Sequence, residues 1–218
     1  MKRYIRGFTL IELTVVLAII GILAAVAVSK LGGLSNGART KEAVSNLASL
    51  NTAMEAYKTS NATYANAAGL PDLAAVGFTV TAGNRYVYSI GSTLVQDRIS
   101  TGPTANGWVM AAGTTQISQD GFETPSIATA NDAVPYAAVV GFPTDQAGNS
   151  APQTSSNGAS YYAAAWGDPG NGKQDIWVIS SAGFKNVGTC GATSGTINVP
   201  AGVPFHWFDA TSCELWVT

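Results

Sequence analysis

A single carboxylic acid, Glu12, interrupts an apolar segment that runs from Phe8 to Val28. Twenty-one helical residues rise about 31 Å, roughly the thickness of the hydrocarbon core of a bilayer. A carboxylate in that environment costs roughly 2.5 kcal/mol or more, so such an acid normally has a partner. A short basic stretch that ends in Gly7 precedes the segment. Cleavage after Gly7 would expose an amine on Phe8, which a carboxylate one helical turn along a neighbouring chain could neutralise.

Three interpretations of this N-terminus are open. A secretory signal peptide would be cut at the small-x-small pattern Ala25-Val26-Ala27, and the mature protein would begin at Val28. An ordinary membrane anchor would keep the apolar segment, but the acid would have no use there. In the third interpretation, the cut after Gly7 keeps the segment and gives Glu12 the amine of Phe8 as its partner.

The sequence Gly7-Phe8-Thr9-Leu10-Ile11-Glu12-Leu13 resembles the processing site of type IV pilins and of type II secretion pseudopilins. The resemblance implies that a prepilin peptidase cuts between Gly7 and Phe8 and that Phe8 is N-methylated. It also implies that Glu12 pairs with the Phe8 amine of a neighbour during assembly, while Thr9 packs in the filament core. The seven-residue leader is typical of type IVa pilins, but Ser29 stands where many of them have a proline.

The same resemblance implies a location and partners. Subunits would wait in the bacterial inner membrane and then form an extracellular, homo-oligomeric helical filament, the pilus, at the cell surface. Head-to-tail contacts between identical subunits give open helical polymers of this kind. The implied partners are the prepilin peptidase, a platform protein, and the assembly and retraction ATPases, so the chain itself need not bind nucleotide.

Composition fits a surface protein. Removal of the leader takes away Lys2, Arg3 and Arg6, which leaves eight basic residues against 13 acidic ones and a net charge of −5. This negative net charge argues against non-specific electrostatic binding of nucleic acid. Charged residues make up only 11% of the chain, and such a weakly charged surface suits close subunit packing.

The two cysteines, Cys190 and Cys213, lie near the C-terminus. In an exported chain a disulfide between them is expected, although two unpaired thiols remain an alternative. Type IV pilins commonly have such a disulfide-bounded C-terminal loop. Two cysteines and the single histidine, His206, do not supply the four ligands of a zinc site.

The pattern along the chain predicts an α+β protein in which a long N-terminal helix packs on an antiparallel β-sheet head, and the resemblance implies that this is the type IV pilin fold with a C-terminal disulfide loop. The apolar residues Ala43, Leu47, Leu50, Met54 and Tyr57 repeat at a spacing that draws one stripe down a helix. The expected segments are a leader (1–7), an apolar membrane and filament-core helix (8–30), its amphipathic continuation (31–60), a connecting loop (61–84) and a β-rich head (85–218). The glycine-rich stretch 31–37 indicates a kink or a break in the helix.

Strand-like runs follow the helix, rich in aromatic and β-branched residues and separated by turn residues. They are 85–90, 108–112, 136–140, 161–166, 176–180 and 214–217. Two segments, 83–89 (GNRYVYS) and 175–179 (DIWVI), resemble the large type IVa major pilins of gliding and predatory bacteria such as Myxococcus. Both are expected to be strand and turn residues rather than a binding site.

No catalytic constellation is found in the sequence. His206 lies between Phe205 and Trp207 and is interpreted as a structural residue. The stretch from Asp168 to Asp175, DPGNGKQD, is rich enough in oxygen ligands to suggest calcium bound by Asp168, Asn171 and Asp175. Its spacing fits no EF-hand, however, and its residues are common in turns. We therefore expect no cofactor, with calcium as the lesser alternative.

The function expected from the resemblance is structural: the major subunit of a type IV pilus filament. A major pseudopilin of type II secretion is one alternative, although those are usually shorter. The other is a secreted binding or adhesive protein that loses its first 27 residues. Motility, adhesion, DNA uptake and secretion share the filament architecture, so the sequence does not choose among them.

Overall fold

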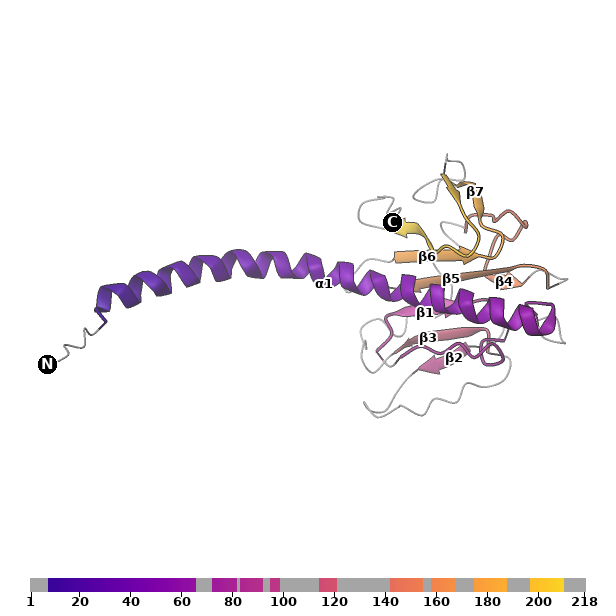
Figure 1. Cartoon of the computed structure of the whole chain (residues 1–218), viewed down its shortest axis with the longest axis horizontal. Coiled ribbons are helices and arrows are strands. Elements are labelled where there is room, and N and C mark those ends of the chain that lie inside the picture. The colour runs from indigo at the N-terminus through magenta and orange to yellow at the C-terminus, as the bar shows by residue number, and fades with distance from the viewer. Residues whose placement is uncertain are drawn as a thin grey trace, which may run out of the picture. The chain divides into compact units, whose positions relative to one another are not determined.

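The computed structural model describes residues 8–65, 72–81, 83–91, 95–98, 114–120, 142–154, 158–167, 175–187 and 197–209 (Figure 1). The backbone divides into two compact units, Met1–Ala38 and Arg39–Thr218, and each is described by itself. From here on, "the head" means this whole second unit, which includes the second part of the helix as well as the β-rich segment.

Helix α1 spans Leu10–Asn61, 52 residues, in the backbone hydrogen-bond pattern of a continuous α-helix. The backbone is helical throughout 31–37, where the glycines indicated a kink or a break. The helix ends at Asn61, after which Ala62 turns into the left-handed region with a φ of 60°. The main-chain N–H of Ala62 donates to the carbonyl of Lys58 at 2.7 Å and closes the last turn.

The predicted apolar stripe is the buried side of α1 in the head. Ala43, Leu47, Leu50 and Met54 are fully buried, whereas Tyr57 is half-buried. These four residues belong to the same core cluster as the sheet residues Tyr86, Tyr88, Ile117, Tyr161, Ala163, Ala165 and Ile179. The prediction that this half of the helix packs on a sheet is therefore confirmed.

The main sheet has the strand order β2-β3-β1-β5-β6-β9, and β4 pairs with β5 beside this path. The bounds are β1 Tyr86–Ser89, β2 Val95–Arg98, β3 Gln116–Asp120, β4 Gln153–Thr154, β5 Tyr161–Gly167, β6 Asp175–Ser180 and β9 Phe205–Asp209. A separate two-stranded sheet pairs β7 (Phe184–Val187) with β8 (Ile197–Val199).

Among the described strands, the main sheet is antiparallel apart from one pair. Strands β2 and β3 run parallel, which differs from the wholly antiparallel sheet expected from the sequence. A parallel pair needs a connection long enough to cross over, and residues 99–115 supply that length. The α+β architecture itself, a helix on a mainly antiparallel sheet, is confirmed.

Three predicted strands are confirmed in β1, β5 and β6. The other three predicted runs, 108–112, 136–140 and 214–217, lie outside the described residues. Strands β2, β3, β4, β7, β8 and β9 were not predicted. Strand β9 contains Phe205 to Trp207, which the sequence analysis considered only as the surroundings of the histidine.

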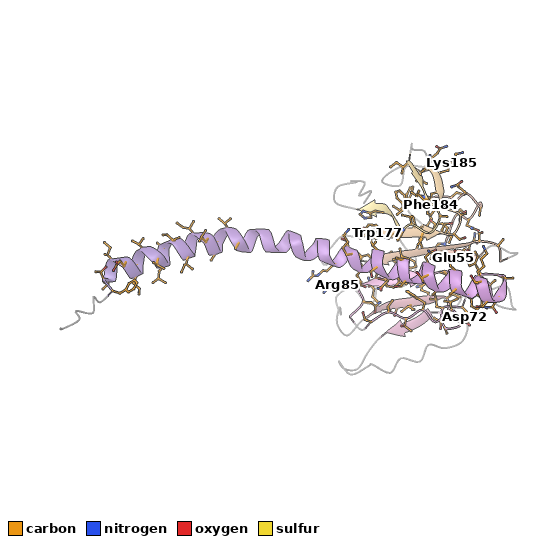
Figure 2. The ribbon with its side chains drawn as sticks, in the orientation of Figure 1. Glu55, Asp72, Arg85, Trp177, Phe184 and Lys185 are labelled. Atoms are coloured by element: carbon orange, nitrogen blue, oxygen red, sulfur yellow. The ribbon has the colours of Figure 1, made fainter. Side chains whose placement is uncertain are left out.

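Strand β5 lies between two layers of core. Its residues Tyr161, Ala163 and Ala165 belong to the helix-side cluster, whereas the alternate residues Tyr162, Ala164 and Trp166 belong to a second cluster. That second cluster also contains Phe184 of β7, which is labelled in Figure 2. Burial on both faces explains why β5 reads as an unbroken apolar run instead of alternating with polar residues.

Candidate functional site

The first turn of α1 is closed by Thr9 and Glu12. The main-chain N–H and the hydroxyl of Thr9 donate to Oε2 of Glu12 at 2.9 and 2.7 Å. In return, the main-chain N–H of Glu12 donates to Oγ1 of Thr9 at 3.3 Å. This reciprocal pair is a capping box, in which two side chains satisfy main-chain N–H groups that have no partner in the helix. Thr9 and Glu12 were expected only to take part in assembly, and their pairing was not predicted, although Thr-x-x-Glu is the sequence signature of a capping box.

Large apolar side chains project from the helix that follows this cap (Figure 2). Phe8 is 83% exposed, and at least half of each of these side chains is exposed: Leu10, Ile11, Leu13, Val15, Val16, Leu17, Ile19, Ile20, Ile22, Leu23 and Val26. By length and composition, Leu10–Ala27 could cross a membrane, a test that a signal sequence near an N-terminus also passes. A surface this apolar requires a bilayer or protein neighbours around it.

Several residues singled out from the sequence lie outside the described part of the chain. Gly7, on the leader side of the expected cleavage site, is one of them. Cys190 and Cys213 are outside it as well, and so are two of the three candidate calcium ligands, Asp168 and Asn171.

Asp175, the third candidate calcium ligand, is buried in the head and fully engaged by protein groups. Its Oδ2 accepts hydrogen bonds from the hydroxyl of Tyr86 at 2.6 Å and from Nε1 of Trp177 at 2.8 Å. Its Oδ1 is in contact with Nε2 of His206. A cation at Asp175 would have to displace these partners. This carboxylate therefore has a structural role, as a hub that joins three side chains.

His206 connects two strands at this hub. Its ring stacks on Trp177 with the centroids 4.3 Å apart and the planes 5° from parallel. Because His206 is on β9 and Asp175 is on β6, the pair fastens β9 to the sheet. The side chain of His206 is only 5% exposed, which suits the structural role expected from the sequence better than that of a base acting on a substrate.

Two tyrosine hydroxyls form hydrogen bonds with polar side chains on one flank of the buried helix stripe, where Asn51 and Glu55 lie one turn apart. Tyr161 donates to Oδ1 of Asn51 at 2.5 Å, and Tyr64 donates to Oε1 of Glu55 at 2.6 Å. Burial raises the pKa of Tyr161 far above the ordinary value of 10.0, so its hydroxyl keeps its proton and remains a donor. The Tyr161–Asn51 pair could not be predicted from local sequence, because its members are 110 residues apart.

The N-terminus matches a known family model, the prokaryotic N-terminal methylation motif, over residues 2–28. Over 216 residues the chain is 32% identical to the type IV major pilin protein PilA of Myxococcus xanthus, which covers 96% of this chain and 94% of that protein. Shorter similarities reach core protein G of the type II secretion system. The Dickeya chrysanthemi protein is 41% identical over 64 residues, 29% of this chain and 42% of that protein. The Escherichia coli K12 protein is 44% identical over 59 residues, 27% of this chain and 41% of that protein.

The similarity to core protein G is confined to the N-terminal part, whereas the similarity to the Myxococcus pilin extends over the head as well. The helix-on-sheet architecture agrees with the longer match. By its N-terminal motif, its fold and its likeness over nearly the whole length, this chain belongs to the type IV pilin family.

Proposed function

We propose that this chain is the major structural subunit of an extracellular type IV pilus. The observation that supports this most strongly is the likeness to a major pilin over nearly the whole chain, head included. The exposed apolar helix supports it too, because a filament core of packed helices would cover that surface. No catalytic residue and no cofactor are assigned in this role. The proposed function includes no bound calcium, because the carboxylate of Asp175 already accepts hydrogen bonds from protein groups.

Processing precedes assembly in this proposal. A prepilin peptidase cuts between Gly7 and Phe8, and the new amine on Phe8 is methylated. The subunit then waits in the inner membrane, held by the apolar part of α1, with its head outside. A disulfide between Cys190 and Cys213 closes the C-terminal loop of the exported head.

Assembly uses the capped acid at the start of the helix. Within the described residues, both hydrogen bonds donated by Thr9 go to Oε2 of Glu12, which leaves Oε1 to accept the Phe8 amine of a neighbour. Inside an apolar bundle, the Glu12 carboxylate and the Phe8 amine of a neighbour neutralise each other only when they meet. This pairing therefore favours a subunit that is placed at the correct position along the filament axis. The platform protein and the ATPases supply the work of extension and retraction.

A major pseudopilin is the less favoured alternative, because the likeness to core protein G covers only 42% of the Dickeya protein. A secreted protein that begins at Val28 is disfavoured as well, because it would discard the segment that carries the methylation motif.

Electron microscopy of cells tests the filament role. Deleting the gene for this chain should remove a class of thin surface filaments, and the wild-type gene should restore them. A Glu12→Gln variant should be processed normally and yet restore few filaments. The proposal would be contradicted if the deletion strain still had the normal number of filaments and those filaments were made of the same protein subunits as in the wild type.

A further inference from the structure

Two buried side-chain amides, those of Asn84 and Gln119, lie where strands β1 and β3 separate. Toward this end of the two strands, the last residues that their antiparallel register pairs are Tyr88 and Ile117. Two residues further on, the same register would place Gln119 beside Tyr86, which makes Asn84 a diagonal neighbour of Gln119 on one face of the sheet. Such neighbours lie about 7–8 Å apart along the backbone, so two amide side chains can meet between them.

Both amides use their nitrogen atoms to bind main-chain carbonyls across this junction. Nδ2 of Asn84 donates to the carbonyl of Ser118 at 2.8 Å and to that of Tyr86 at 3.0 Å. Nε2 of Gln119 donates to the carbonyl of Arg85, a residue labelled in Figure 2, at 2.7 Å. Reversing either amide would bring its oxygen against a carbonyl oxygen, so these contacts determine the orientation of both groups.

The two amide oxygens have no such partners. Among the described residues, no group donates a hydrogen bond to Oδ1 of Asn84 or to Oε1 of Gln119, although both atoms are buried. Each residue is only 2% exposed. Leaving one buried acceptor without a donor is costly, and here two of them belong to neighbouring side chains. The junction therefore requires a small ligand that donates hydrogen bonds, which excludes anions.

We propose that a buried water molecule bridges Oδ1 of Asn84 and Oε1 of Gln119 and completes the junction of β1 and β3. A water molecule has two hydrogens to donate, one for each oxygen. Internal waters in proteins typically bind buried polar groups that no protein group satisfies. The separation of the two strands beyond Tyr88 and Ile117 is what gives the molecule its place.

The bridged amides help to connect the sheet to the helix. Gln119 of β3 binds the carbonyl of Arg85, and the main-chain N–H of Arg85 donates to Oε1 of Glu42 on α1 at 3.0 Å. A water that keeps the amide of Gln119 in place thus supports a path from β3 through Arg85 to α1. This inference concerns the head alone and does not depend on whether the chain forms a filament.

A crystal structure of the full chain in detergent, at a resolution that shows ordered water, tests the proposal. One water molecule should lie about 2.8 Å from both amide oxygens. Gln119→Leu removes one of the two acceptors, so its structure should lack this water. Gln153→Leu is the matched control, because Gln153 is an exposed glutamine on β4, and its structure should retain the water.

The wild-type structure decides the question even if Gln119→Leu does not fold. A well-ordered junction without a bridging water, or with a metal ion in its place, would overturn the proposal. A water that remains at Asn84 in Gln119→Leu would overturn the bridge as well, because the second acceptor would then be unnecessary.

Discussion

The hydroxyl of Tyr161 on β5 donates a hydrogen bond of 2.5 Å to Oδ1 of Asn51 on α1. The two residues are 110 positions apart, and the bond joins the central strand of the head to the middle of the helix segment above it. Gly202, with a φ of +70°, lies against the same asparagine, since a Cβ built on it would come within 2.9 Å of Nδ2 of Asn51. Asn51 therefore links the helix both to strand β5 and to the turn at Gly202.

Tyr161→Phe should lower the free energy of unfolding by about 1 kcal/mol, because it deletes one largely buried hydrogen bond and leaves Asn51 without its donor. Urea denaturation measures the loss. A double-mutant cycle with Asn51→Ala separates the bond from other effects of each change, and a coupling energy of about 1 kcal/mol is expected. Additive single effects would mean that the two side chains do not depend on each other.

Asp175→Asn should destabilise the head by about 2–3 kcal/mol, because hydrogen bonds to a charged acceptor are stronger than neutral ones and three donors converge on it. Denaturant unfolding followed by tryptophan fluorescence reports the change directly, since Trp177 is one of those donors. His206→Phe is the companion variant. It keeps a ring against Trp177 and leaves Asp175 with two donors, so its loss should be smaller. If Asp175→Asn were as stable as wild type, the Asp175 carboxylate would not have the structural role described above.

Ala62→Gly should stabilise the protein by about 1 kcal/mol, because Ala62 has a φ of 60°, where a side chain is strained and glycine is not. Ala56→Gly is the matched control. Ala56 is exposed within the regular part of the same helix, so glycine there should cost about 1 kcal/mol. Both values come from chemical denaturation, and the same sign for the two substitutions would show that the left-handed turn carries no strain.

Thr9→Ala should reduce the yield of assembled filaments roughly fivefold, because the capping box contributes about 1 kcal/mol and also holds the acid. Quantification of protein sheared from cells, normalised to the membrane pool, gives the yield. Thr9→Ser keeps the hydroxyl and should assemble nearly as well as wild type. If the alanine and serine variants assemble equally, the hydroxyl of Thr9 has no part in assembly.

The sequence predicted those parts of the molecule whose pattern is local. The stripe of Ala43, Leu47, Leu50 and Met54 follows from helix periodicity, and β5 follows from a dense run of tyrosines, alanines and a tryptophan. Strand β3 was missed because QISQD reads as polar. Several of its polar side chains are nevertheless buried, and composition does not reveal burial of that kind.

The contacts between distant segments could not be predicted at all. Asp175 and His206 are 31 residues apart, and each has an ordinary local explanation, a turn residue and a lone histidine. Only the antiparallel register of β6 and β9 brings them together. The capping box at Thr9 and Glu12 is the opposite case, since its spacing was visible but the acid had already been assigned to a neighbouring subunit.

In the proposed function, the chain keeps its apolar helix and polymerises through it. Intact-mass and N-terminal analysis of protein sheared from the cell surface tests this most directly. A pilin subunit should begin at Phe8, carry one added methyl group and lack two hydrogens at Cys190 and Cys213. A chain that begins at Val28 would contradict it, because Glu12 and the apolar first part of α1 would be gone.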